Sequence, residues 1–135
     1  MTVQFTVPGK PTGKQRPRFN SKTRTTYTPE ETLSYEEDVQ RAYRMATKAK
    51  MLKGNIKAEI VAYYPIPKST SKKQRADMIE GFLLPTKKPD TDNIAKIILD
   101  SLNGIAYDDD SQVVSLLVLK RYAENPRVEV RLEEI

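Results

Sequence analysis

An acidic segment in the second half of the chain constrains its fold and chemistry most strongly. Six carboxylates lie between Asp90 and Asp110, and Lys96 is the only basic residue among them, although the whole chain has a formal net charge of +5. Carboxylates gathered in one place repel one another unless something positive neutralises them. Hard cations such as Mg²⁺ bind through a few carboxylates together with substrate phosphates. The segment therefore predicts a cation site.

The opposite charge is concentrated near the N-terminus. Residues 1–29 contain six basic residues and no acidic residue, so they carry +6, while the remaining 17 basic and 18 acidic residues sum to −1. Lysine and arginine bind phosphates through charge and hydrogen-bond geometry. A basic arm at about 9–27 beside a separate acidic cluster suits a polyanion that is held by one part and cleaved by another. The sequence therefore indicates a nucleic-acid partner.

Length and composition limit the possible chemistry. A chain of 135 residues fits one domain, which we place at 1–135. Cysteine and histidine are absent, which excludes disulfides, a thiolate nucleophile and an imidazole base or ligand. Any catalysis must use carboxylates, lysine, tyrosine or hydroxyl groups. The first residues lack a signal-peptide pattern, and no apolar run approaches the roughly 20 residues of a membrane span. We therefore expect a cytoplasmic protein with no membrane contact.

The apolar pattern predicts an α+β fold. Alternation predicts strands at 3–7 and 56–65, and glycine and proline at 9–27 predict an extended loop or loose hairpin. Two β-rich segments, 113–122 and 128–132, are most simply an antiparallel hairpin. Helices are expected at about 29–50, 71–80 and 91–102, with Thr28 capping the first and Asn103-Gly104 ending the last. We expect a single domain with a mixed or antiparallel sheet of about four strands and packed helices.

The third predicted helix places charged residues on one surface. Asp92, Lys96 and Asp100 are spaced four apart and therefore share a face. Asp90 precedes the helix and Asp92 lies in its first turn, where the positive helix end favours anions. If the loop that holds 108–110 folds back on this end, one of its carboxylates completes a metal site with one open side.

A purely structural reading of these residues stays open. An Asp-x-Asp pair at a helix start is common in N-capping, and Asp92, Lys96 and Asp100 also fit an ordinary salt-bridged, solvated face. The triplet at 108–110 alone fits a turn. Two acidic clusters together in a basic protein favour the metal site.

The same residues resemble a known family. Lys-Pro-Asp-Thr-Asp-Asn-Ile-Ala-Lys, then Leu-Asp-Ser-Leu-Asn-Gly, then Asp-Asp-Ser-Gln-Val resemble the signature of RusA-type Holliday junction resolvases of bacteria and their prophages. The match is dense over 88–114, and 14–18 and 27–29 are similar to the family's N-terminal region. The resemblance implies a RusA-like fold and a homodimeric, Mg²⁺-dependent endonuclease, with Mn²⁺ as a substitute ion, that makes paired nicks across a four-way DNA junction.

The resemblance also implies roles for individual residues. The family's Asp-x-Asp carboxylates fall on Asp90 and Asp92, its helix lysine on Lys96, and its later acid on Asp110. Asp109 is the alternative for the last of these ligands, because three aspartates follow one another here. Asp100 matches a further family acid. It is either a direct metal ligand, or a residue that forms a salt bridge with Lys96 or contacts one of the ligands from behind.

The basic residues are candidates for DNA contacts. Those that lie just before the acidic motif or within the N-terminal arm are Lys14, Arg16, Arg18, Arg24, Lys87 and Lys88. Phe19 and Tyr27 are interleaved with the arginines and suit stacking on exposed bases. Two other functions remain open at this stage: a metal-dependent nuclease for flaps or other branched DNA, and a non-enzymatic, basic DNA-binding protein.

Overall fold

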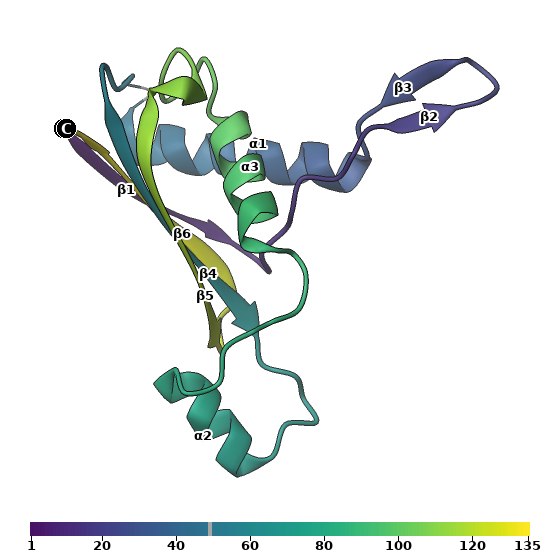
Figure 1. Ribbon diagram of the computed structural model, residues 1–135, viewed down its shortest axis with the longest axis vertical. Helices are drawn as coiled ribbons and strands as arrows, with labels where there is room; N and C mark the ends of the chain where they lie inside the picture. The colour runs from purple at the N-terminus through teal and green to yellow at the C-terminus, as the bar shows by residue number, and fades with distance from the viewer. Residues whose placement is uncertain (49) are drawn as a thin grey trace.

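The computed structural model describes residues 1–48 and 50–135, which form one four-stranded sheet, a small separate hairpin and three α-helices (Figure 1). In chain order the elements are β1 (Thr2–Pro8), β2 (Arg18–Asn20), β3 (Thr25–Tyr27), α1 (Glu30–Thr47), β4 (Ile56–Pro65), α2 (Lys72–Glu80), α3 (Thr91–Ser101), the 3₁₀ turn η1 (Asp110–Gln112), β5 (Val113–Ala123) and β6 (Arg127–Glu134). The expected α+β fold with a four-stranded sheet is confirmed.

The sheet is mixed and has the strand order β1-β6-β4-β5. β6 is antiparallel to both β1 and β4, whereas β5 is parallel to β4. The predicted antiparallel hairpin of 113–122 with 128–132 is therefore wrong, because β4 lies between β5 and β6. Val128, Val130 and Leu132 are buried, and a position between two neighbouring strands buries such residues better than a sheet edge does.

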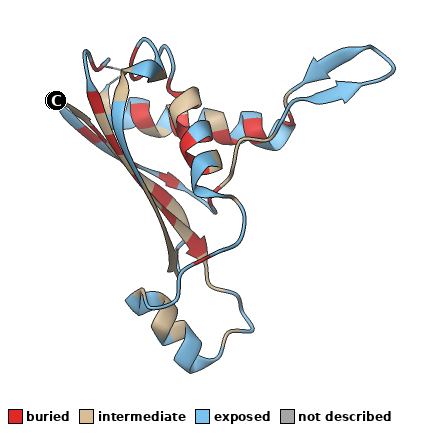
Figure 2. Cartoon of the chain, in the orientation of Figure 1, coloured by how far each residue is buried: buried red, intermediate tan, exposed pale blue. Residues whose placement is uncertain are grey.

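One face of the sheet carries the core. α1 and α3 both lie on this face, and the red, buried positions of Figure 2 follow the strand surfaces beneath them. β4 alternates strictly between buried and half-buried residues, as a strand covered on one face should. α3 contributes Ile94, Ile97 and Ile98, each at most 1% exposed. The parallel crossover from β4 to β5 thus places α3 on the sheet and fixes the position of its charged surface.

The helix ends differ slightly from expectation. α1 ends at Thr47 and not near residue 50, with Lys48 in a left-handed conformation after it. It begins at Glu30 with Pro29 at the cap position and no side-chain cap, so the Thr28 capping prediction is wrong. Ser71 caps α2 through a hydrogen bond from the Gln74 amide at 3.2 Å.

Two segments project from the body. The β2–β3 hairpin extends away from the start of α1, and α2 forms a lobe at the opposite side of the molecule (Figure 1). Every residue of β2 and β3 is exposed, which confirms the loose-hairpin alternative for part of the arm. Across 1–48 and 50–135, none of the helices combines the length and the apolar character needed to cross a membrane.

Candidate active site

The N-terminus of α3 presents two exposed carboxylates. Asp90 occupies the cap position but its side chain makes no capping hydrogen bond, and Asp92 lies in the first turn. Within 1–48 and 50–135, neither side chain forms an ion pair or a hydrogen bond with protein. Both carboxylates are therefore available to a ligand, in the field of a helix N-terminus that favours anions.

The loop that carries Asp90 is fixed by β4 and β5. The Tyr64 hydroxyl donates to the Pro89 carbonyl at 2.5 Å, and the Lys120 ammonium donates to the Lys87 carbonyl at 2.7 Å. Burial raises the pKa of Tyr64 to about 12, and the charge of the nearby Asp90 carboxylate adds to the rise. Tyr64 thus stays a neutral donor that positions the backbone just before the helix.

A cleft of about 570 Å³ adjoins Asp90. One of its walls is the extended segment at 10–15, which is joined to α3 by a hydrogen bond from the Lys14 amide to the Asn93 carbonyl at 3.4 Å. Lys10, Lys87 and Lys88 line the cleft, and all three are exposed. The cleft therefore combines ammonium groups with a free carboxylate, an arrangement that can hold an anion beside a cation.

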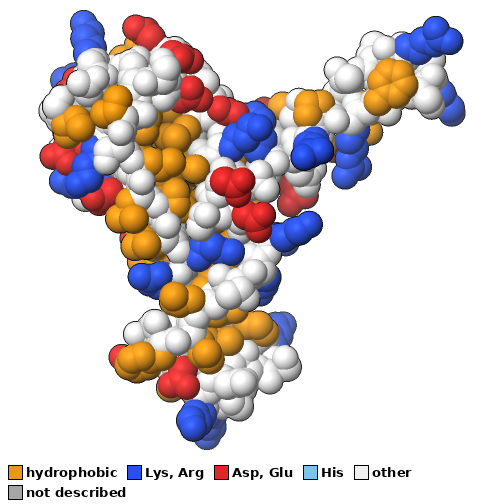
Figure 3. All heavy atoms as spheres, viewed as in Figure 1, with side chains coloured by type: hydrophobic (Ala, Val, Ile, Leu, Met, Phe, Trp, Pro, Cys, Tyr) orange, Lys and Arg blue, Asp and Glu red, His pale blue; other side chains and the backbone are white. Residues whose placement is uncertain are grey.

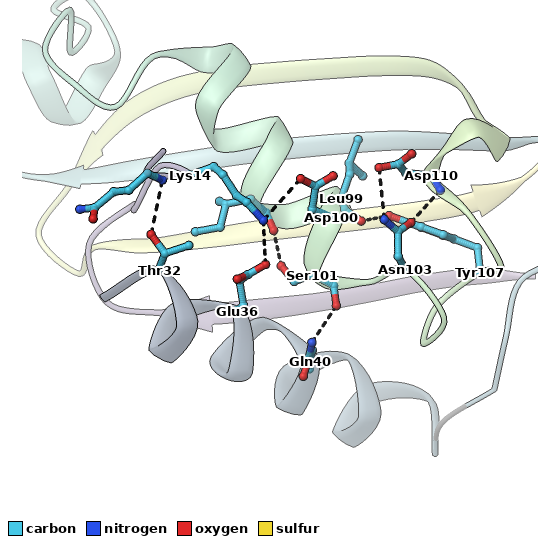
Figure 4. Close-up of polar contacts among 12 residues, drawn as sticks. Lys14, Thr32, Glu36, Gln40, Leu99, Asp100, Ser101, Asn103, Tyr107 and Asp110 are labelled. Atoms are coloured by element: carbon cyan, nitrogen blue, oxygen red, sulfur yellow. Dashed lines mark hydrogen bonds and ion pairs between the residues drawn. The ribbon is translucent and has the colours of Figure 1, made fainter. Parts of the chain in front are cut away.

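Lys14 is engaged within the protein. Its ammonium lies 3.2 Å from Glu36 on α1 and 3.5 Å from Asp100 on α3, so it joins the arm to both helices (Figure 4). The structure thus gives Asp100 a different ion-pair partner from the predicted Lys96. Among the described residues Lys96 forms no ion pair and is exposed, one turn beyond Asp92. The salt-bridged face of Asp92, Lys96 and Asp100 is not formed.

Asp110 lies at the other end of α3, where Asn103 holds it. The Asp110 amide donates to the Asn103 side-chain carbonyl at 2.8 Å, and the Asn103 side-chain amide faces the Asp110 carboxylate at 3.5 Å (Figure 4). Desolvation raises the pKa of Asp110, and the nearby Asp100 carboxyl raises it further. A carboxyl group beside a second carboxyl retains its proton more readily than an isolated one.

Asp109 has a different environment from Asp110. Its carboxylate accepts a hydrogen bond from the Ser111 amide at 3.3 Å and caps η1, while Gln112 completes the capping box. Hydrogen bonds from the Ser111 hydroxyl and amide hold the pKa of Asp109 below its usual range. Asp109 therefore orders the turn, while Asp110 faces the end of α3.

The predicted ligands thus form two groups. Asp90 and Asp92 lie at the start of α3, while Asp100 and Asp110 meet at its end, roughly 12 Å further along the helix axis at 1.5 Å per residue. Within the described residues, no three acidic side chains are close enough to hold a metal together. Mg²⁺ commonly binds one or two carboxylates and completes its shell with phosphate oxygens and waters. The free pair Asp90 and Asp92 suits such a cation by its donor chemistry.

The arm arginines lie apart from both carboxylate groups. Arg16 is exposed just before the hairpin, Arg18 lies on β2, and Arg24 lies in the turn between β2 and β3. Arg18 is paired with Tyr27 across the hairpin, and Phe19 projects from the other face with 62% of its surface exposed. The hairpin therefore presents cations and aromatic rings to solvent together.

Sequence analysis missed two polar residues that organise the site. Asn103 was assigned only to the helix end, yet its side chain binds Asp110 seven residues later. Tyr64 carries no predicted role in the sequence, yet its hydroxyl positions the loop before α3. Asn-Gly at a helix end is a common signal for termination alone, and nothing local to Tyr64 indicates a partner 25 residues away.

Comparisons with known proteins place the chain in a family. The family described as endodeoxyribonuclease RusA matches residues 8–133, which is nearly the whole chain. A relative from Bacillus subtilis (strain 168), named "Uncharacterized protein YqaN", is 36% identical over 137 aligned positions. The alignment covers 98% of this chain and 96% of that relative.

Proposed function

The chain belongs to the RusA family of endodeoxyribonucleases, and from this membership we propose that it resolves four-way DNA junctions by paired, Mg²⁺-dependent nicks. The family is one of enzymes, so the chain is an endonuclease and the non-enzymatic alternative falls away. Family membership implies a nuclease that acts on Holliday junctions. The ion, the pairing of the nicks and the residue roles below are parts of the proposal.

One observation carries the proposal most directly. Asp90 and Asp92 are exposed carboxylates beside a lysine-lined cleft, and neither has a partner within the described residues. Structural capping would engage at least one of these side chains with the helix amides, as Ser71 does on α2. Free carboxylates of this kind in a protein of net charge +5 are suited to a cation and an anionic substrate.

We assign the cation to Asp90 and Asp92, with Mn²⁺ as a substitute for Mg²⁺. When bound, such a cation supplies Lewis-acid stabilisation of the charge that develops on the scissile phosphate. Lys96 lies one turn along the same surface with its ammonium free, so it would neutralise the same developing charge. The family motif also has an acid after the helix. We assign this position to Asp110 and not to Asp109, because Asp109 is committed to capping η1.

The DNA path follows the exposed cations. Lys87 and Lys88 flank the carboxylate pair and would contact the phosphates of the strand to be cut. Arg16, Arg18 and Arg24 would bind backbone phosphates further from the cut. Lys14 already pairs with Glu36 and Asp100, so we assign it to anchoring the arm and not to holding DNA.

Paired nicking requires two sites. A four-way junction presents two equivalent strands, and a two-fold homodimer presents two equivalent copies of one site. One chain has one pair of carboxylates at the start of α3, and neither has a partner among residues 1–48 and 50–135. We therefore propose that the active species is a homodimer.

The decisive experiment measures cleavage of a mobile four-way junction, a flap and a linear duplex, each with Mg²⁺, with Mn²⁺ and with EDTA. We expect the junction to be cut in preference to the other two substrates, and only with a divalent ion. Asp90→Asn and Asp92→Asn should each lower the rate by about 10³-fold or more while junction binding persists. Glu37→Gln is the matched control, because it removes the same single negative charge at an exposed position on α1. This variant should retain full activity.

Each contrary result has a definite meaning. A wild-type rate for either aspartate variant would remove these residues from the cation site. Preferential cleavage of the flap would favour the branched-DNA alternative over junction resolution.

A further inference from the structure

Within 1–48 and 50–135, the outer edge of β5 has no paired strand, and residues 114–117 of this strand are exposed. β5 is the last strand in the sheet order, so no strand in the described part of the chain pairs with its outer side. It is 11 residues long, and its first seven residues, Val113–Leu119, include no charge and no proline. Soluble proteins normally protect an edge with charged side chains, proline, bulges or short length. The first part of β5 has a register irregularity at Val114 but no charge and no proline, and Ser115–Leu119 pairs regularly with β4. This stretch is therefore weakly protected, which indicates that something covers it.

The exposed side chains of β5 are apolar on both faces of the sheet. Leu116 lies opposite Ala58, on the face that carries the helices, and Leu117 lies opposite Glu59, on the other face. Leu116 is 47% exposed, Leu117 49% and Val114 60%. A partner that covers all three must therefore meet the strand edge-on and contact both faces, as an added strand does.

The α2 lobe extends this apolar surface. α2 packs against β5 and is fixed to its far end by an ion pair between Arg75 and Glu124 at 2.8 Å. Ile79, Phe82 and Leu84 are exposed on the lobe, Phe82 to 78%. Figure 3 shows hydrophobic side chains gathered along this side of the body and again over the lobe. Exposed apolar side chains gathered in this way mark an interaction site.

We infer that the edge of β5 is the surface through which two copies of this chain join, antiparallel and about a two-fold axis at Leu116. This inference deepens the proposed function, which calls for a homodimer, by naming the contact surface. Two β5 strands joined in this way connect two four-stranded sheets into one continuous sheet. In an antiparallel pair, two directly opposite residues are either both hydrogen-bonded or both not hydrogen-bonded. A two-fold axis that relates two identical strands must therefore pass midway between one residue and its own copy. Leu116 is the midpoint of the uncharged run 113–119.

Charge complementarity favours a second copy as the occupant. β5 begins after the acidic residues 108–110 and carries Lys120 and Arg121 near its end at Ala123. With the axis at Leu116, Lys120 lies opposite Gln112 of the partner subunit and Arg121 opposite Ser111 of the partner subunit. The basic end of one strand therefore approaches the acidic start of the other, and no like charges of the two strands lie directly opposite.

The absence of cysteine makes this register testable. A single cysteine can form a disulfide only with its copy in another chain, and Leu116→Cys places the two cysteines directly opposite each other. Leu117→Cys is the matched control: it is equally exposed, but the two copies would lie about 7–8 Å apart as diagonal neighbours. We expect Leu116→Cys to form a covalent dimer under mild oxidation and Leu117→Cys to form far less. Absence of cross-linking at Leu116, or equal cross-linking at both positions, would overturn the inference.

Sedimentation of charged variants gives an independent readout. Leu116→Lys places two ammonium groups at the axis and should convert the dimer to a folded monomer, with the fold checked by circular dichroism. Leu33→Lys, at 48% exposure on α1, should remain dimeric. A dimeric Leu116→Lys protein, or a wild-type protein that is monomeric with and without junction DNA, contradicts this interface. Junction cleavage by wild-type protein is measured separately, so failure of the interface is distinguished from failure of the proposed function.

Discussion

Gly13 lies against Pro89 so closely that no side chain fits between them. A Cβ atom added at Gly13 would lie 2.8 Å from the Pro89 Cβ and 3.2 Å from the Asn93 Cβ. Pro89 directly precedes the cap residue Asp90, and Asn93 lies in the first turn of α3, so both flank the presented carboxylates. The basic arm and the carboxylate pair are thus held together at a backbone contact that glycine alone permits.

Gly13→Ala should therefore impair cleavage without unfolding the protein. The added methyl forces the 10–15 segment away from α3, and a shift of about 1 Å at a catalytic centre can lower the rate by about 10²-fold. Thr12→Ala, at the neighbouring half-buried position, is the control and should cut normally. Junction cleavage and the melting temperature are measured for both variants. A fully active Gly13→Ala protein would show that the arm need not pack here.

Lys96→Ala should lower the cleavage rate by about 10²–10³-fold at saturating Mg²⁺. Because the Lys96 ammonium contacts no carboxylate among the described residues, its removal should leave the Mg²⁺ concentration for half-maximal rate nearly unchanged. A titration of the single-turnover rate with Mg²⁺ separates the two effects. If Lys96→Ala instead needs far more Mg²⁺, the lysine acts through the cation site. Lys96→Arg, which keeps the positive charge, should cleave faster than Lys96→Ala.

Two buried tyrosines should respond in opposite ways to loss of the hydroxyl. The Tyr107 hydroxyl donates to the Leu99 carbonyl at 2.6 Å, whereas the Tyr35 hydroxyl is buried with no partner among the described residues. Tyr107→Phe should lower the free energy of unfolding by about 1 kcal/mol, and Tyr35→Phe should leave it unchanged or raise it. Urea unfolding at one fixed protein concentration checks both. Equal destabilisation by the two changes would contradict this assignment.

The sequence predicts best those features that depend on near neighbours. The strand at 56–65 matches β4 at both ends, because alternation of buried and half-buried residues is a local signal. The helix at 91–102 matches α3 to within one residue, since its apolar spacing and its Asn-Gly end are both local. The charged surface of α3 and the two exposed aspartates at its start follow from the same spacing.

Long-range contacts are what local reasoning misses. Lys96 is the nearest cation to Asp100 in sequence, but Lys14 reaches Asp100 from 86 positions earlier because the arm crosses between α1 and α3. Likewise β5 and β6 follow one another in sequence, yet β6 inserts between β1 and β4, where Val130 is only 2% exposed. The order of strands in a sheet depends on which arrangement buries the most apolar surface. A short stretch of sequence does not contain this information, because the surface comes from distant parts of the chain.

The salt dependence of junction binding tests the role of the projecting hairpin. Each phosphate contact that is lost should reduce the slope of log K against log [salt] by about 0.9. Arg18 and Arg24 are exposed on a hairpin with no acidic residue in it, so replacing both by alanine should weaken binding and reduce the slope by about 1–2. Lys53→Ala combined with Lys48→Ala removes the same charge from exposed positions away from the hairpin and should change the slope little. Phe19→Ala should weaken binding with the slope unchanged, because a stacking contact releases no counterions. Equal slopes for the arginine variant and the lysine control would mean that the hairpin does not contact the DNA backbone, and the DNA surface would then have to be sought around the cleft beside Asp90.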